Sequence, residues 1–337
     1  MKFNSWYDKN HKKLLIIPSI ILTLSLIYLT IFAIQTGDVM YKDVSLTGGS
    51  TITVPTNLSA QNLEDALSKN ITDITIKTIS DNSGNQLEIS LTVKEENTPL
   101  LKESLEEILG YQLTSENSST ETTSASLSED FYKQLIVAIT LSFFWMAAVV
   151  FLIFAKGKGI KTKVVVLNIL LGFFLGNLFL VLNPLLSAAI FFIFATLLIR
   201  IYIKKSVPAF AVMLSAFADI IMTLTVVNLI GMKLSTAGIV AFLMLIGYSV
   251  DTDILLTTRL LKRKTGVNST LFNAFKTGTT MTLTSIIAIL AALFVVYPFG
   301  SVLNQIFTIL LIGLGLDLFN TWITNASIIK WYVEEKQ

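Results

Sequence analysis

The chain has 337 residues, of which 53% are hydrophobic and only 14% are charged, whereas soluble domains have about 45–50% apolar and about 25% charged residues. This composition is typical of a membrane protein, and the net charge of +2 gives no indication of a nucleic-acid partner. The absence of cysteine excludes a disulfide framework and a thiolate metal site. The single histidine, His11, lies among lysines and is interpreted as a solvated residue at the membrane interface, so we predict no metal and no cofactor.

The first hydrophobic run covers residues 14–34, close to the ~20 residues needed to cross a bilayer. It lacks a convincing small-residue cleavage site, which favours an uncleaved transmembrane helix over a signal peptide. Residues 1–13 include several lysines and are therefore predicted to be a cytoplasmic N-terminus.

Residues 35–114 are polar and alternate between the periods of strands and helices, which predicts an extracytoplasmic α+β domain. Pro99 is tolerated in the first turn of a helix, and Gly110 ends that helix. The order of elements, βαββαβ, is the ferredoxin-like arrangement. The expected elements are a strand at 50–54, a helix at 58–69, strands at 71–79 and 87–93, a helix at 98–109 and a strand near 111–114.

This domain shows no cluster of histidines, no nucleophile beside a base and no phosphate-binding glycine loop, so we predict a binding or lever module without catalytic residues. Gly48-Gly49 is not followed by the Gly-Lys-Ser/Thr of a nucleotide site, and we interpret it as a backbone bend at the membrane exit. Residues 115–133 are rich in Ser, Thr and Glu, which predicts a flexible linker to the helical part.

Residues 134–330 are almost continuously hydrophobic and are predicted to form a transmembrane helical bundle of seven spans, which makes eight with the first helix. Lysine and arginine cluster in alternate loops. The positive-inside rule therefore assigns both termini, including residues 331–337, to the cytoplasm and residues 35–133 to the outside of the cell membrane. The expected spans are 134–155, 164–182, 185–203, 206–230, 235–258, 277–297 and 305–330.

Four acidic residues lie inside these spans, where a carboxylate at the bilayer centre costs roughly 2.5–3.5 kcal/mol. With a rise of about 1.5 Å per residue, Asp219, Asp251 and Asp317 each come near the middle of a ~30 Å hydrocarbon core. Asp253 follows in the same helix as Asp251. The pattern predicts an intramembrane proton or ion pathway formed by these four residues.

Helical geometry separates the two neighbouring acids. Asp251 and Asp253 lie about 200° apart around a helix, so they cannot both face one pathway if the helix is straight. Asp253 shares a stripe with Ser249 and Thr257, whereas Asp251 shares one with Gly247. Either one acid carries the proton and the other supports a neighbouring helix, or the helix is distorted at Gly247.

The segment from Gly247 to Arg263, GYSVDTDILLTTRLLKR, resembles the signature of the SecF family of the Sec protein-export machinery in its archaeal form. Three further stretches are similar to the family: D-x-x-x-x-G-G at 43–49, S-V-P-A-F-A-V at 206–212, and T-G-T-T at 277–280, which opens the next-to-last span. These motifs stand in the family's order and cover most of the chain.

The resemblance implies a non-enzymatic accessory subunit of the resistance-nodulation-division superfamily, which uses the proton motive force to pull exported chains outward. The implied partners are a SecD-like subunit, the Sec translocation channel, exported unfolded polypeptides and membrane lipid. The residues expected to support the acids are Gly247, Tyr248, Ser249, Thr252, Arg259 and Lys276.

The chain also departs from the family. The family has six spans, so one hairpin between about residues 156 and 200 is interpreted as an insertion. Bacterial members read G-Y-S-x-N-D, and their acid aligns with Thr252, which leaves open whether Asp251 or Asp253 takes its role. They also carry an arginine shortly before S-G-T-T, where this chain has Phe272, with Lys276 as the nearest cation.

Two other classes of protein have related features. A proton-driven small-molecule or lipid exporter of the same superfamily would share buried acids and an outer domain, but such pumps usually repeat the whole unit in a longer chain. An intramembrane aspartyl protease needs two facing acids in Y-D and G-x-G-D motifs, and the spacings Tyr248 to Asp251 and Gly313 to Asp317 differ from these. Loss of secretion, of drug efflux or of peptide cleavage would separate the three.

Overall fold

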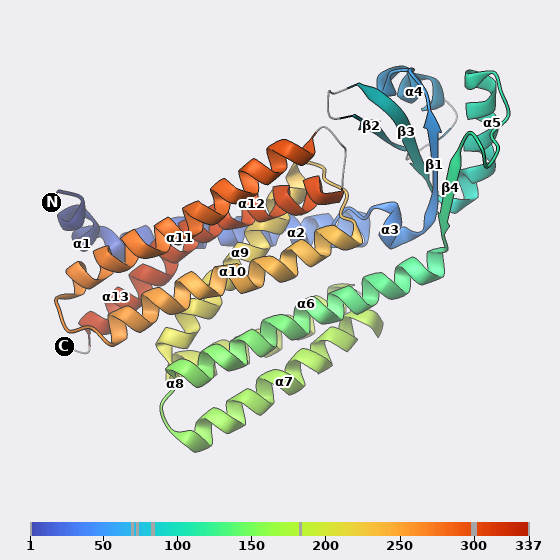
Figure 1. Ribbon diagram of the computed structural model, residues 1–337. Coiled ribbons are helices and arrows are strands. Elements are labelled where there is room, and N and C mark those ends of the chain that lie inside the picture. Colours follow the sequence, from blue (N-terminus) through green and yellow to red (C-terminus); the bar gives the residue numbers. More distant parts are fainter. Residues whose placement is uncertain are drawn as a thin grey trace.

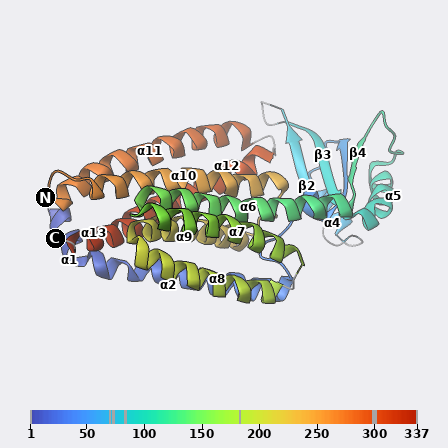
Figure 2. The ribbon, with the colours of Figure 1, turned by 90° about the horizontal axis from the view of Figure 1, so that it is seen from below.

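The computed structural model describes residues 2–68, 71, 74–81, 85–181, 184–297 and 302–335. Its helices form an elongated bundle, and a small domain with a β-sheet lies beyond one end of that bundle (Figure 1). The two termini lie together at the other end, as both views show (Figures 1 and 2). The chain is therefore a multi-pass helical membrane protein with an α+β domain, which confirms the predicted fold class.

Among the described residues, seven helical stretches are long and apolar enough to cross a membrane. The first, Tyr7–Thr36, joins the end of α1 (Lys2–Leu14) to α2 (Ile16–Thr36). The predicted span at 185–203 corresponds to α8, which is not among the seven, so its membrane crossing remains a prediction. The other bundle helices are α6 (Ala125–Phe154), α7 (Lys158–Val181), α8 (Pro184–Lys205), α9 (Val207–Leu229), α10 (Thr236–Leu261), α11 (Val267–Val296) and α12 (Val302–Asn320).

Local sequence features set the ends of these helices. The side chains of Ser124, Ser206 and Ser235 each accept a hydrogen bond from the backbone N–H three residues later, which satisfies one of the free donors at a helix start. The last span does not continue as a uniform α-helix, because Thr321–Asn325 form a π-helical turn before α13 (Ala326–Glu334). Such wide turns are frequent at functional sites.

The α+β domain beyond one end of the bundle, here called the outer domain for that position alone, contains a four-stranded antiparallel sheet in the order β2-β3-β1-β4. Alternate residues of the strands, such as Ile52 and Val54, are buried against Leu63 and Leu101 of the two helices. Strand order and connections confirm the predicted ferredoxin-like arrangement. The elements are β1 (Gly49–Pro55), α4 (Ala60–Leu67), β2 (Thr75–Ser80), β3 (Gln86–Val93), a 3₁₀ turn (Glu95–Asn97), α5 (Thr98–Leu109) and β4 (Ser119–Thr123).

The last strand lies later in the chain than predicted. Residues 111–114 form no strand, and β4 at Ser119–Thr123 pairs with β1 instead. The prediction of a flexible linker at 115–133 was therefore wrong, because its Ser and Thr residues complete the edge of the sheet and Ser124 then begins α6. The sheet continues directly into the bundle without a flexible tether.

The glycine pair at the membrane exit confirms the predicted backbone bend. Gly48 and Gly49 follow the short helix α3 (Val44–Thr47) and have φ values of 81° and 153°. A Cβ on Gly48 would lie 2.4 Å from the Cα of Ala125, and one on Gly49 would lie 2.2 Å from the carbonyl oxygen of Val93. Both conformation and space therefore require glycine here.

The N-terminal helix α1 packs against the C-terminal helix α13. The fully buried ammonium of Lys330 donates hydrogen bonds to Asp8 and, at 2.6 Å, to Oδ1 of Asn268, and it lies 3.5 Å from the Glu334 carboxylate. His11 is only 5% exposed, and its Nε2 is 3.5 Å from Glu334. The prediction of a solvated His11 was wrong, because α1 turns this residue toward α13.

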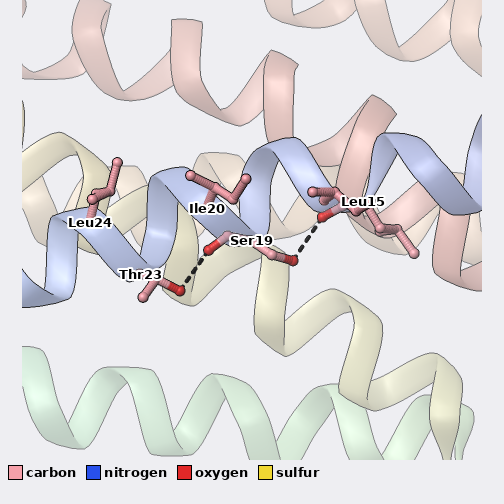
Figure 3. Close-up of a pocket in the computed structure, with 6 residues that line it drawn as sticks. Leu15, Ser19, Ile20, Thr23 and Leu24 are labelled. Carbon is pink, nitrogen blue, oxygen red and sulfur yellow. Dashed lines mark hydrogen bonds between the residues drawn. The ribbon is translucent and has the colours of Figure 1, made fainter.

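The exposed face of α2 shows how a membrane surface accommodates hydroxyl groups. A groove with a volume of about 400 Å³ is lined by Leu15, Ile16, Ser19, Ile20, Thr23 and Leu24 (Figure 3). The hydroxyls of Ser19 and Thr23 donate, each at 2.7 Å, to the backbone carbonyls of Leu15 and Ser19. These hydroxyls are thus satisfied within the helix, and the groove presents mainly hydrocarbon to its surroundings.

Candidate intramembrane carboxylate site

Three of the four predicted acids lie together inside the bundle. Asp219 of α9, Asp253 of α10 and Asp317 of α12 are each no more than 1% exposed. Asp317 interacts electrostatically with both other carboxyls, and Asp219 also acts on Asp253. The acids predicted to reach a similar depth were Asp219, Asp251 and Asp317, and the cluster contains Asp253 in place of Asp251.

Asp219 is held by neutral donors on two neighbouring helices. The hydroxyl of Ser249 on α10 donates to its Oδ2 at 2.5 Å, and the amide of Asn320 on α12 donates to its Oδ1 at 2.7 Å. Asp317 accepts from the hydroxyl of Thr321 at 3.2 Å. Asp219 therefore links the three helices of the site, and both of its oxygens are occupied.

Asp253 differs from Asp219 because, among the described residues, one of its oxygens lacks a partner at full hydrogen-bond geometry. The amide of Asn325, in the π-helical turn, donates to Oδ1 at 2.8 Å and to the Asp253 backbone carbonyl at 3.3 Å. In the part of the chain that the structure describes, Asp253 Oδ2 and the neighbouring hydroxyl of Ser215 have no partner at full hydrogen-bond geometry. Asp253 thus retains an oxygen at which a proton can be gained or lost.

Asp251 lies on the opposite face of α10, outside this cluster. Ser249, Asp253 and Thr257 are at most 1% exposed, whereas Asp251 and Gly247 are exposed. α10 is continuous from Thr236 to Leu261, so the acids are separated by ordinary helical geometry, and no distortion at Gly247 is needed. The structure therefore brings Asp253, and not Asp251, to the site.

The predicted supporting residues have different positions. Tyr248 is exposed beside Gly247, and Thr252 packs at the contact with α11, where a Cβ on Gly278 would lie 3.0 Å from its Cγ2. Arg259 donates to Thr277 at 2.9 Å and to the Asn273 carbonyl at 3.2 Å, and Lys276 is exposed. For the described residues, no ion pair joins a cation to the three buried acids. Arg259 and Lys276 are therefore not brought into the site.

Sequence reasoning missed the polar residues of the last span that surround the acids. Asn320, Thr321, Thr324 and Asn325 are all buried, and three of them donate to the carboxyl groups as described above. Their spacing is the signal that could have found them, because residues one, four and five positions apart share one side of a helix. A polar stripe in an otherwise apolar span has the same meaning as a buried acid.

The chemistry of this site follows from burial and from the neutral partners. A buried carboxylate needs a compensating proton, cation or set of donors. Like charges at close range in a low-dielectric interior also repel strongly. Three carboxyl groups surrounded by amides and hydroxyls can therefore hold and exchange protons, but they cannot all be charged at once at low cost.

Known proteins are similar to this chain in sequence and in fold. Residues 175–335 match the family model for the C-terminal part of the protein-export membrane proteins SecD and SecF. The chain is 33% identical over 334 residues to the protein-export membrane protein SecF of Methanocaldococcus jannaschii, covering 97% of both chains. It is 30% identical to SecF of Pyrococcus furiosus, covering 98% of this chain and 94% of the relative.

One solved structure shares the arrangement of the helices and the sheet. SecDF, a translocon-associated membrane protein from Thermus thermophilus, matches the chain with a TM-score of 0.58 at 15% sequence identity. The match covers all of this chain, which spans 39% of that protein. At this identity the likeness concerns the fold alone.

Proposed function

The chain belongs to the SecF family of protein-export membrane proteins, and we propose that it uses the proton motive force to assist protein export across the cell membrane. As a family member it is an accessory subunit of the Sec export machinery. The observation that supports the finer proposal is the buried cluster of Asp219, Asp253 and Asp317. All of their hydrogen-bond donors among the described residues are neutral. Proton carriage explains why three costly carboxyl groups share the interior of one bundle.

In this proposal Asp253 is the principal carrier. Loss of its proton adds a charge beside Asp219 and Asp317, and like charges repel in a low-dielectric site. The donors that respond lie at the two ends of the π-helical turn: Asn320 is the last residue of α12, and Asn325 is the last residue of the turn. Each protonation change therefore alters the hydrogen bonds between α9, α10 and the last span.

We propose that both termini are cytoplasmic and that residues 35–133 are extracytoplasmic. The connections α6–α7, α8–α9 and α10–α11 lie at the same end of the bundle as the termini (Figure 1). The clustered lysines and arginines lie in these connections or in the helix ends beside them, which favours the cytoplasmic side. The outer domain lies at the opposite end.

A reporter fused after Asn117 is expected to be external, and one fused after Lys264 is expected to be cytoplasmic. The reason is that the two positions lie at opposite ends of the bundle, and basic loops remain inside. Accessibility of the reporter in intact cells measures the result. A reversed signal at either position would contradict the proposed orientation.

The exposed face of α10 is proposed to meet a SecD-like subunit. Val240, Met244, Gly247, Tyr248 and Asp251 recur at helical spacing on this face and are all exposed. A carboxylate facing lipid at this depth costs roughly 2.5–3.5 kcal/mol, and no hydrogen bond to Asp251 occurs within the described chain. A partner helix that supplies a donor or a cation would remove this cost. The Sec translocation channel and exported unfolded polypeptides are the other proposed partners.

Protein export by membrane vesicles with and without this chain tests the proposed function. We expect the chain to increase export only while a proton gradient is present, so that an uncoupler abolishes the difference between the two preparations. Efflux of small dyes from the same vesicles is the control for the alternative of a small-molecule exporter. Dye efflux that depends on the chain, without an effect on protein export, would overturn the proposal.

A further inference from the structure

The segment at residues 38–47, between α2 and β1, connects the outer domain to the bundle, and we name it the junction segment. Its backbone pairs with the loop between α9 and α10: Asp43 N–H donates to the Leu234 carbonyl at 2.8 Å, and Leu234 N–H donates to the Tyr41 carbonyl at 2.7 Å. The side chain of Ser45 accepts from the Thr236 N–H at 3.2 Å. The junction segment is therefore hydrogen-bonded to the start of the helix that carries Asp253.

The side-chain amide of Gln305 on α12 also makes hydrogen bonds to this loop. Its Oε1 accepts from the N–H of Ser235, at 3.0 Å, and from the hydroxyl of Ser235, while its Nε2 donates to the Lys233 carbonyl at 2.6 Å. A Cβ at Gly238 would lie 2.6 Å from this Oε1, so the close approach depends on a glycine. One side-chain amide thus joins the outer ends of α10 and α12.

The loop held by Gln305 also touches the sheet of the outer domain. The ammonium of Lys233 donates to the hydroxyl of Thr75 on β2 at 3.5 Å, and Lys77 of β2 lies 3.9 Å from Asp43 in the junction segment. The domain is also joined to the bundle at Gly48 and at Ser124, without a flexible linker. A displacement of the loop therefore displaces the sheet as well.

We propose that Gln305 is a positioning residue that couples the carboxylate site to the outer domain. The inference rests on the proposed proton-driven function and names the part that transmits its movement. α10 and α12 both reach from the acids to this amide, over roughly 18–27 Å at about 1.5 Å per residue. Because helices are stiff along their axes, a shift of α12 against α10 at the acids reaches their outer ends. The amide makes the loop, the junction segment and the sheet follow that shift.

The first measurement is uncoupler-sensitive export by the complete complex in vesicles. Gln305→Ala removes all the amide contacts, and Gln305→Glu keeps the acceptor for Ser235 but places an oxygen against the Lys233 carbonyl. We expect both variants to lower gradient-dependent export about threefold or more, with gradient-independent export unchanged. Asn304→Ala is the matched control, because the neighbouring amide donates to the Tyr297 carbonyl, at 3.1 Å, and makes no hydrogen bond to the loop among the described residues.

The second measurement follows the position of the domain. The chain has no cysteine of its own, so Lys102→Cys and Ile230→Cys provide two exposed positions for spin labels, one on α5 and one at the outer end of α9. We expect a broader distance distribution between the labels in Gln305→Ala than in the control Asn304→Ala. Gln305→Glu provides the same comparison if the alanine variant does not insert.

The proposal requires that the Gln305 variants have both lower gradient-dependent export and a broader distance distribution between the labels. Gradient-dependent export that is retained would overturn the coupling role of Gln305, whatever the distance distribution. Export that is lost without a change in the distance distribution would overturn it as well. If Asp253→Asn abolishes gradient-dependent export while the Gln305 variants do not, only this inference fails. If Asp253→Asn also has no effect, the proposed role of Asp253 as principal carrier fails, and if an uncoupler has no effect on export by the unaltered protein, the proposed function itself fails.

Discussion

Replacing Asp253 by asparagine is expected to reduce export to the level that remains in the presence of an uncoupler. Asparagine keeps the shape of the side chain and an oxygen that can accept from Asn325, whose amide lies 2.8 Å from Oδ1 of Asp253, but it cannot alternate between a charged and a neutral carboxyl. The protein should therefore insert and bind its partner normally. Export would be measured in vesicles with and without an uncoupler, and partner binding by co-purification.

Two asparagine variants provide matched controls for this substitution. Asp317→Asn changes the same chemistry in an equally buried position and is expected to have a much smaller effect on export. Asp251→Asn changes a residue on the exposed face, so we expect weaker co-purification of the SecD-like partner. Full uncoupler-sensitive export in Asp253→Asn would refute the proton-carrier role of Asp253.

Replacing Gly49 by alanine is expected to destabilise the outer domain by about 3 kcal/mol, from backbone strain and overpacking together. The φ of 153° is unfavourable for alanine, and the new Cβ would lie 2.2 Å from the Val93 carbonyl oxygen on the neighbouring strand. Relief of this clash requires separation of β1 from β3. Thermal unfolding of the protein in detergent, followed by protease cleavage in the outer domain, measures the loss.

Gly110→Ala separates the two causes of that loss. Gly110 also has a positive φ, 76°, but a Cβ added to it would meet no atom within 4 Å. Only strain remains there, and we expect a cost of about 1 kcal/mol. Equal stability losses at Gly49 and Gly110 would show that the contact with Val93 is unimportant.

The acids of the site could be predicted from the sequence because the cost of a charge in a membrane leaves few explanations for Asp219, Asp253 and Asp317. Helical periodicity also separated Asp253 from Asp251. Which of the two faces the interior could not be predicted, because one helix does not reveal where its neighbours lie. Asn320 and Asn325 were not predicted as site residues. A neutral amide costs less free energy in the membrane than a carboxylate, so its presence in an apolar span is a weaker signal of function.

The outer domain shows where composition misleads. Alternating residues predicted β1 and β3 well, and the helical period predicted α5 well, since the buried positions of all three form one core. β4 at Ser119–Thr123 is mostly exposed and contains no apolar residue, so its sequence is typical of a linker. Its strand conformation comes from pairing with β1, a partner distant in the chain. Local composition does not predict such long-range pairing.

The ion pair between α1 and α13 bears on the order of events during synthesis. Asp8 and Lys330 are 322 residues apart, so Asp8 leaves the ribosome long before its partner exists. The hydroxyl of Tyr7 is also made long before Ser327, which lies 3.1 Å away in the finished protein. α1 therefore acquires its docking surface only after α13 has been synthesised and inserted, and until then the charge of Asp8 must be balanced by other groups.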